Sequence, residues 1–219
     1  MNEEIRQELQ KRNVNIIRFV EISKLSERQT QGFTKAILLG MKLSQKFITD
    51  VQENIPIKHD EFIEQEEYTD RLADWLAEFI RQKGYQAYSQ SEKSHIENKN
   101  FDKKTKTSVL PHKTIALLGG LGFIGKNNLL ITEEYGCAFS MCTVLTNAPI
   151  ETENTSIIAS KCGECEACIN ICPTKAIHGK KWTQGIEREL LIDITKCNCP
   201  LKCMVHCTWT IKYAKKDVI

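Results

Sequence analysis

The sequence predicts an α+β fold in two parts, an N-terminal α/β layer over residues 1–150 and a smaller, cysteine-rich lobe over residues 151–219. Two observations predict the layer: short apolar, β-branched runs alternate with helical segments, and one of these segments has a clear helical periodicity. A third predicts the lobe, because eight of the ten cysteines lie between Cys162 and Cys207. At 219 residues the chain can form one large domain or two small ones.

The composition is that of a soluble globular protein, with 41% apolar and 26% charged residues, which excludes a collagen-like or wholly disordered chain. No apolar run approaches the roughly 18 to 20 residues of a membrane span, and the start MNEEIRQELQ lacks the layout of a secretory signal. We therefore expect a cytoplasmic protein without membrane association. The formal charge of +2 is too small to indicate nucleic-acid binding by itself.

The elements of the N-terminal part follow from its apolar patterns. A helical stretch near residues 2–12 leads into two candidates for buried strands, NIIRFVEI at 15–22 and AILLGM at 36–41. A long helix is predicted over 60–83, and residues 85–88 form a further strand candidate. The apolar positions of the long helix recur with helical spacing at Leu72, Trp75, Leu76, Phe79 and Ile80.

Residues 89–107 are almost wholly polar. A loop of this length is unusual in a compact domain, and it is interpreted either as a disordered connector or as a mobile lid over a site. Two chemically interesting residues lie within it, His95 and Asp102, and we expect both to face solvent.

The cysteine-rich lobe opens with Cys162, Cys165, Cys168 and Cys172, followed by Pro173, which is the bacterial ferredoxin pattern C-x2-C-x2-C-x3-C-P. The first three cysteines of this pattern converge on one [4Fe–4S] cluster, and the fourth ligates the other cluster of a pair. A disulfide framework would need an oxidising compartment, which no signal in the sequence indicates. A zinc site is the alternative, although zinc sites favour paired C-x2-C knuckles separated by a dozen or more residues.

A second run downstream, KCNCPLKCMVHC, supplies four more thiolates, so that eight are present for two clusters. We assign a first cluster to Cys162, Cys165, Cys168 and Cys207. We assign a second cluster to Cys172, Cys197, Cys199 and Cys203. The alternative is a single cluster beside a zinc site or free thiols. The C-terminal part is therefore predicted to be a ferredoxin-like double-cluster lobe that transfers electrons.

The two remaining cysteines, Cys137 and Cys142, lie before the run and lack its spacing. A buried free cysteine behaves as a small hydrophobic residue. Both are interpreted as core thiols.

A glycine-rich segment, KTIALLGGLGFIGKNNLL at 113–130, lies towards the end of the N-terminal part. Gly120, Gly122 and Gly125 superficially match a dinucleotide fingerprint, but the residues after them are predicted to form two strands around a Glu-Tyr-Gly turn rather than the helix that a Rossmann site needs. The glycines let the backbone approach a flat ligand or another chain segment, or they form a plain tight turn. We expect a Gly-rich hairpin here.

Taken in order, ALLGGLGFIGKNNLLIT, a hairpin, CGECEACINICPTKAI and the downstream cysteines resemble the epoxyqueuosine reductase family and its double-cluster relatives, which include reductive dehalogenases. The resemblance covers residues 105–207 and extends to 1–104 only in their α/β character. It implies two [4Fe–4S] clusters that pass electrons to a cobalamin-type cofactor, which drives reductive removal of oxygen or halide. The corrinoid would be lined by Gly120, Leu121, Gly122, Phe123, Gly125, Lys126 and Asn127.

The chain departs from the family pattern in three places. Lys106 and Thr107 stand where the family has an aspartate, its presumed proton donor, before VLPHKTIA. Asp102 could replace this acid through the polar loop, but no catalytic residue is assigned. The tRNA-modifying members continue into a helical-repeat domain, whereas this chain stops at Ile219. Its gap between Cys172 and Cys197 is also longer, so we do not expect a tRNA partner.

Three functions are compatible with these observations. The first is an oxidoreductase in which the clusters reduce a cobalamin-type cofactor. The second is a non-catalytic electron carrier that reduces a partner such as a corrinoid protein. The third is a small interaction module that uses its clusters only as structural staples. For the first two we expect an electron donor or acceptor protein as partner, together with a small molecule or a corrinoid protein.

Overall fold

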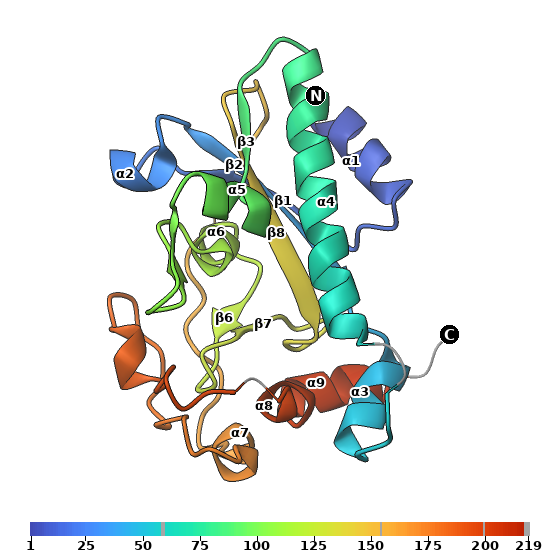
Figure 1. Ribbon diagram of the computed structural model, residues 1–219, viewed down its shortest axis with the longest axis vertical. Coiled ribbons are helices and arrows are strands. Elements are labelled where there is room, and N and C mark those ends of the chain that lie inside the picture. The colour runs from blue at the N-terminus through green and yellow to red at the C-terminus, as the bar shows by residue number, and fades with distance from the viewer. Residues whose placement is uncertain (58–59, 154, 199, 217–219) are drawn as a thin grey trace. The chain divides into compact units, whose positions relative to one another are not determined.

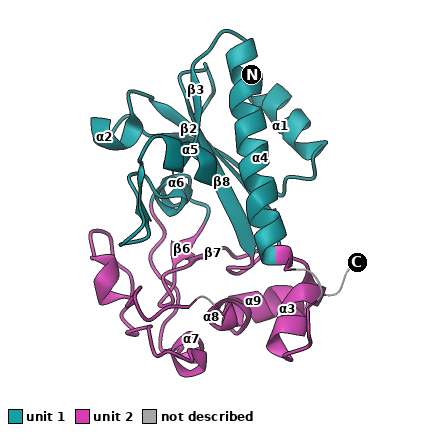
Figure 2. Ribbon diagram, in the orientation of Figure 1, with its two compact units in different colours: residues 1–42, 62–121, 139–156 teal, residues 43–61, 122–138, 157–219 magenta. Residues whose placement is uncertain are grey.

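The computed structural model describes residues 1–57, 60–153, 155–198 and 200–216. The fold is α+β, as the sequence predicts (Figure 1). Two compact units, coloured separately in Figure 2, share the chain. Unit 1 comprises Met1–Lys42, Phe62–Leu121 and Phe139–Ser156, and unit 2 comprises Leu43–Glu61, Gly122–Ala138 and Ile157–Ile219. The domain boundary expected between residues 150 and 151 stays a prediction.

Unit 1 is built around a four-stranded antiparallel sheet in the order β1-β2-β8-β3. Its strands are β1 (Ile16–Glu21), β2 (Lys35–Lys42), β3 (Ala87–Ser89) and β8 (Phe139–Thr146). Its helices are α1 (Asn2–Gln10), α2 (Glu27–Thr30), α4 (Glu61–Gln82), α5 (Glu92–Glu97) and α6 (His112–Leu118). The two strands and the long helix that the apolar runs predict are confirmed as β1, β2 and α4.

Two layers of helix cover the sheet. On one face, Ile17, Phe19, Ile37 and Leu39 pack with Ile5 and Leu9 of α1 and with Leu72, Leu76 and Ile80 of α4. The helix α6 lies on the other side and contacts β1, β2 and β8. Cys142 of β8 belongs to the core of the first face and is fully buried, as expected for a core thiol.

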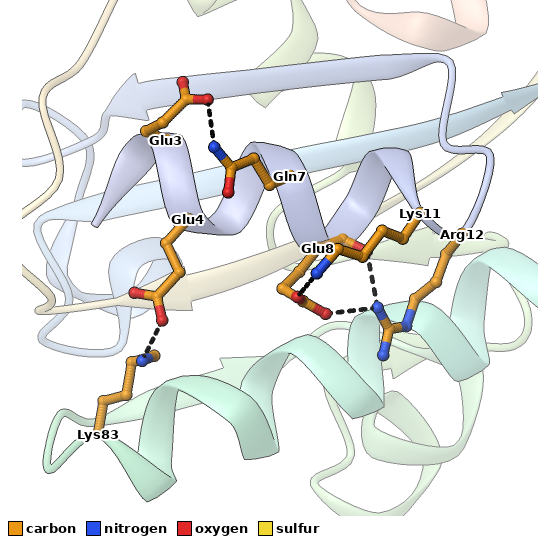
Figure 3. A network of polar contacts seen from close by, with 7 residues as sticks. All are labelled: Glu3, Glu4, Gln7, Glu8, Lys11, Arg12 and Lys83. Atoms are coloured by element: carbon orange, nitrogen blue, oxygen red, sulfur yellow. Dashed lines mark hydrogen bonds and ion pairs between the residues drawn. The ribbon is translucent and has the colours of Figure 1, made fainter.

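Polar contacts attach the N-terminal helix to the long helix (Figure 3). Lys83, just after α4, pairs with Glu4 at 2.5 Å, and Glu8 pairs with Arg12 at 2.8 Å. The Arg12 guanidinium also lies 3.7 Å from the centre of the Trp75 ring. These contacts place α1 beside α4, where its apolar side reaches the core.

The polar segment at 89–107 differs from the expected loop. It contains α5 and a short hairpin of β4 (Phe101–Asp102) and β5 (Thr107–Ser108). Ser91 caps α5 by accepting a hydrogen bond from the Ser94 N–H at 3.3 Å, a local signal that the segment's polar composition conceals. The expectation that His95 faces solvent is wrong, because α5 turns it inward and leaves it only 6% exposed. Asp102 is exposed, as expected.

Unit 2 has little regular structure. It contains α3 (Gln45–Gln52), β6 (Phe123–Ile124), β7 (Leu130–Ile131), α7 (Ala167–Ile171), a 3-10 turn (Arg188–Leu190), α8 (Lys202–Val205) and α9 (Thr208–Ala214). The helix α8 contacts α3, α7 and α9. No helix in the described part of the chain has both the length and the apolar character that crossing a membrane requires.

The Gly-rich hairpin is confirmed: β6 pairs with β7, with Phe123 opposite Ile131. The two strands predicted around the Glu-Tyr-Gly turn are present as β7 and β8. At the turn, Thr132 and Gly136 form an isolated bridge, and β8 joins the sheet of unit 1. The reason is that β8 is buried along its length and finds two long-range partners, β2 and β3.

Candidate iron–sulfur centre

The ferredoxin-type run forms a wrapped loop that leads into a short helix. Cys165 donates its N–H to the Cys162 carbonyl at 3.0 Å, which closes a tight turn. Gly163 lies within this turn at φ +52°, a left-handed conformation that disfavours residues with a Cβ. Cys168 lies in α7, and Cys172 ends that helix. The spacing of the run therefore produces local turns that bring its first sulfurs near one another.

The four thiols assigned to the first cluster lie near one another. Burial raises the pKa of the Cys168 thiol to about 11. Negative charge on three further thiols adds to this rise, and these are Cys207, Cys162 and Cys165. The structure thus brings the downstream Cys207 to the first three cysteines of the run, although no regular spacing links it to them.

Hydrogen-bond donors surround Cys172, the first thiol assigned to the second cluster. Burial alone would raise the pKa of Cys172, but hydrogen bonds to its sulfur outweigh burial and lower the pKa. The Thr174 hydroxyl lies 3.6 Å from Sγ, and the Ala176 N–H donates to it at 3.4 Å. N–H···S and O–H···S bonds of this kind favour the thiolate, which is the form that ligates iron.

Two other thiols of the second set, Cys197 and Cys203, lie around an apolar cluster that contains Cys172. Cys168, Cys172, Ala176, Ile177 and Ile192 form this cluster, and Cys197 and Cys203 pack against it. An isolated bridge between Ile177 and Ile192 holds the segment after the ferredoxin run against the segment before the second run. Cys199 lies outside the described residues. The donor chemistry fits iron–sulfur clusters, because thiolates, N–H groups and apolar side chains are gathered together.

One cysteine that the sequence did not connect with this centre lies next to it. Cys137 is 5% exposed, and its thiol donates to the Met204 carbonyl at 3.6 Å and lies 3.3 Å from Thr210 Oγ1. Burial of Cys137, expected of a core thiol, is confirmed. These partners, on either side of Cys207, were not foreseen, because they are far from Cys137 in the sequence. Among the described residues, no three His, Cys, Asp or Glu side chains form a group that could hold a single metal ion.

The glycines of the Gly-rich segment make room for the chain itself. A Cβ at Gly122 would lie 2.1 Å from the Ile131 carbonyl oxygen across the hairpin. In unit 1, Gly120 has φ +60°, and a Cβ there would lie 2.3 Å from Thr155 Oγ1. Close approach to another chain segment, one of the interpretations of these glycines, accounts for both positions.

The polar side chains of this segment bind the cysteine-rich loops. Lys126, 6% exposed, donates from Nζ to the Cys165 carbonyl at 3.0 Å. Asn127, 3% exposed, donates from Nδ2 to the Cys203 carbonyl at 3.3 Å. These two residues attach the Gly-rich hairpin to both cysteine runs.

The burial of the side chains in the Gly-rich segment bears on the expected corrinoid-binding face. Phe123 is 1% exposed and packs edge-to-face on Trp209 at 5.5 Å between ring centres. With Lys126 and Asn127 also buried, these side chains face their own unit rather than an open surface. Gly120 and Leu121 are partly exposed. In this conformation the side chains of Phe123, Lys126 and Asn127 are therefore not available to a corrinoid.

Asp102, the possible substitute for the missing acid, has the wrong electrostatics for that role. Its carboxylate accepts the N–H groups of Lys104 at 2.8 Å and Thr105 at 3.2 Å and so closes the turn between β4 and β5. Hydrogen bonding from the Thr105 backbone, followed by that from Lys104, lowers the pKa of Asp102. A general acid needs a raised pKa near the working pH, so the structure assigns Asp102 a turn-forming role.

Comparison with known proteins supports the iron–sulfur interpretation. Residues 155–178 match the family model described as a 4Fe-4S binding domain. Over 80 residues the chain is 38% identical to the epoxyqueuosine reductase of Lactococcus garvieae (strain Lg2). This segment of the chain is similar in sequence to epoxyqueuosine reductases. This match covers 36% of the chain and 22% of that reductase, so the matched segment spans about a fifth of the curated relative.

The fold of the chain is also similar to that of solved proteins. A solved epoxyqueuosine reductase from Bacillus subtilis aligns with a TM-score of 0.61 at 16% identity, over 95% of this chain and 65% of that chain. A reductive dehalogenase, whose structure is described as suggesting a mechanism for B12-dependent dehalogenation, aligns with a TM-score of 0.58 at 16% identity. That alignment covers 90% of this chain and 30% of the dehalogenase. At these identities the likeness shows a shared fold.

Proposed function

We propose that the chain is an iron–sulfur redox protein that passes single electrons through two [4Fe–4S] clusters for a reductive reaction. The observation that carries this proposal is the contact of Cys165 Sγ with the Thr208 hydroxyl at 4.0 Å, which brings the residue after Cys207 to the ferredoxin-type run. Such a pairing is expected where a cysteine from outside the run completes the cluster that the run begins.

The ligand sets in this proposal are those derived from the sequence. Cys162, Cys165, Cys168 and Cys207 hold the first cluster. Cys172, Cys197, Cys199 and Cys203 hold the second cluster. When bound, each cluster supplies a one-electron carrier whose potential depends on hydrogen bonding and solvent access. The buried side chains of Ile177 and Ile192 exclude water from one side of the Cys172 thiol. The hydrogen-bond donors around Cys172 stabilise its thiolate.

The more specific part of the proposal is that a cobalamin-type cofactor accepts the electrons. It rests on the resemblance to epoxyqueuosine reductases and on the fold shared with a B12-associated dehalogenase. The corrinoid-binding role of the Gly-rich segment stays a prediction. The residues assigned to it are Gly120, Leu121, Gly122, Phe123, Gly125, Lys126 and Asn127. A corrinoid would have to bind against backbone and the partly exposed Leu121, because Phe123, Lys126 and Asn127 are buried.

A non-catalytic electron carrier is the second candidate function, and one observation favours it. The side chains of the Gly-rich hairpin are engaged in holding the cysteine-rich loops. In this role the hairpin is a structural support for the clusters, and the electrons leave to a partner protein. Neither candidate requires a tRNA. We expect no tRNA complex at physiological ionic strength, and a submicromolar complex whose affinity collapses with added salt would contradict this.

Elemental analysis of anaerobically reconstituted protein tests the cluster proposal. We expect about eight irons per chain and a matching amount of sulfide. Cys168→Ser and Cys197→Ser should each lose about half of the iron and leave the electron paramagnetic resonance (EPR) signal of the other cluster. Zinc in place of iron, or about four irons in the fully loaded wild type, would contradict two clusters.

Cobalamin titration separates the two candidate functions. Reconstituted protein is mixed with cobalamin, passed through a desalting column and examined by absorption spectroscopy. Stoichiometric retention with a shift to the base-off spectrum supports the corrinoid reductase. Absence of retention, with persistent re-oxidation of the reduced clusters by an acceptor protein, supports the carrier.

A further inference from the structure

Two histidines that are far apart in the sequence come together in unit 1. His95 lies in α5 and His112 is the first residue of α6, and the centres of their rings are 6.2 Å apart. Both helices belong to unit 1. Neither histidine belongs to the cysteine-rich centre, and the proposed function does not use this pair.

A glutamine and a threonine join the histidine pair. The backbone N–H of Gln90 donates to the Thr143 carbonyl at 2.9 Å, and Nδ1 of His112 lies 3.0 Å from the Thr143 hydroxyl. The side chain of Gln90 donates from Nε2 to the carbonyl oxygen of Leu110, two residues before His112, at 3.1 Å. Gln90 is therefore held beside the start of α6.

Three buried polar atoms of this group have no hydrogen-bond partner within the described part of the chain. They are both ring nitrogens of His95 and Oε1 of Gln90. His95 is 6% exposed and Gln90 is 1% exposed. Burying a polar atom without a partner destabilises a protein, so three such atoms in one place indicate that a bound group satisfies them.

The chemistry of these atoms favours a metal ion as that group. Burial lowers the pKa of both imidazoles, so both rings are neutral at pH 7 and each has a nitrogen lone pair. When Nδ1 of His112 carries the ring proton, it donates to the Thr143 hydroxyl and leaves the lone pair on Nε2. A hydrogen bond of this kind is what orients metal-binding histidines in proteins.

The spacing of the two rings also fits a shared ion. A histidine nitrogen binds zinc at about 2.0–2.1 Å, so the ring centres of two histidines on one ion lie roughly 5 to 6.5 Å apart. The observed separation of 6.2 Å falls within this range.

We propose that His95 and His112 bind a divalent transition-metal ion such as zinc, with the amide oxygen of Gln90 as a third donor. Imidazole nitrogen is a preferred ligand of zinc, and an amide oxygen is a weaker one. The site relies on two histidines and an amide, which distinguishes it from the groups of three His, Cys, Asp or Glu that are absent from the described residues. The fourth position is open to water or to a small molecule.

The experiment measures zinc binding to the full chain with its clusters in place. Anaerobically reconstituted protein is dialysed against buffered zinc at pH 7.5, and zinc and iron are counted per chain. Since the cluster thiolates are then occupied by iron, we expect one zinc per chain in addition to the iron.

His95→Leu and His112→Gln each remove one ligand and should weaken zinc binding at least about tenfold. His95→Leu should fold, because leucine replaces two buried, unpartnered nitrogens with an apolar side chain of similar size. His178→Gln is the matched control, because His178 is exposed, and it should bind zinc like the wild type. The iron content should be the same in all four proteins.

X-ray absorption at the zinc edge identifies the donors without any substitution. We expect nitrogen and oxygen at about 2.0–2.1 Å, with the scattering pattern of histidine rings. Sulfur alone, at about 2.3 Å, would assign the zinc to cysteines and overturn the inference.

Two other results would overturn it. Wild type that has its full iron but retains no zinc would show that water satisfies the buried nitrogens. Equally tight zinc binding in His95→Leu, His112→Gln and the wild type would show that the ion lies elsewhere. The inference does not rest on the proposed function: absence of iron from the wild type refutes the clusters, whereas nitrogen-coordinated zinc that is lost in His95→Leu supports this site.

Discussion

The ammonium group of Lys126 donates a hydrogen bond to the carbonyl oxygen of Cys165, with 3.0 Å between Nζ and O. The two residues are 39 positions apart, and the bond connects the tip of the Gly-rich hairpin to the loop of the ferredoxin-type run. Lys126 is almost fully buried, so the bond is shielded from competing water. The hairpin and the first cysteine loop are therefore one structural element of unit 2.

Lys126→Met should accelerate the loss of iron from the reconstituted protein. A hydrogen bond from a charged donor contributes about 1.5 to 3 kcal/mol, so we expect iron release to a chelator to become about tenfold faster. Lys181→Met is the control, because Lys181 pairs with Glu164 at an exposed position where ion pairs contribute little. Equal release rates for the two variants would contradict a supporting role of Lys126.

Gly122→Ala should destabilise the protein through a backbone clash. The new Cβ would lie 2.1 Å from the Ile131 carbonyl oxygen, and overpacking of this kind costs about 3 kcal/mol or more. Gly32→Ala is the control for backbone strain without a clash, because Gly32 has φ +83° and an added Cβ would lie in open space. It should cost only about 1 to 2 kcal/mol. Urea unfolding followed by tryptophan fluorescence measures both, and the opposite ranking would contradict this prediction.

The histidine pair of unit 1, His95 and the partly buried His112, predicts a loss of stability in acid. Burial, and then the charge of His95 at 6.2 Å between ring centres, lower the pKa of His112 to about 4. Since the unfolded value is about 6.5, the unfolded chain takes up a proton that the native protein does not as the pH falls through 6.5. Stability is thus complete above that pH and declines towards pH 4, by up to about 3 kcal/mol.

His112→Gln should therefore flatten the pH dependence of unfolding between pH 7.5 and 5. The measurement is the urea midpoint at each pH, with His178→Gln at an exposed position as the control. An unchanged slope in His112→Gln would show that the acid sensitivity arises elsewhere in the chain.

Thr174→Val should lower the potential of the second cluster and leave the first cluster unchanged. The Thr174 hydroxyl lies 3.6 Å from Cys172 Sγ, and valine keeps its shape without the donor. We expect a shift on the order of tens of millivolts, since about 59 mV corresponds to a tenfold change in a one-electron equilibrium. Thr195→Val, whose hydroxyl bonds Asp193 instead, is the control. A shift of the first cluster would contradict the assignment of Cys172.

The features that the sequence predicts well are those that depend on local pattern. The apolar stripe of α4 and the β-branched run of β1 are local, and each appears within a residue or two of its expected bounds. The cysteine spacing from Cys162 to Cys172 is also local, and it predicts the wrapped turn that the structure contains.

The features that the sequence does not predict depend on distant partners. His95 is buried because α5 packs into unit 1. The polar residues that flank it in the sequence give no sign of this burial. Gly122 is required by a carbonyl on the opposite strand, which pattern alone does not distinguish from a ligand. The contact between Cys137 and Thr210 has no sequence signature, because it arises only when the turn at Gly136 meets α9.

The chain passes between unit 1 and unit 2 five times. Residues 43–61 and 122–138, which include α3 and the Gly-rich hairpin, belong to the same unit as the cysteine runs. A gene fragment encoding only residues 151–219 would therefore express the sulfur ligands without the segments that brace them. In the proposed ligand arrangement, the first cluster cannot be completed during translation until Cys207 has left the ribosome. By then the bracing segments have already been synthesised.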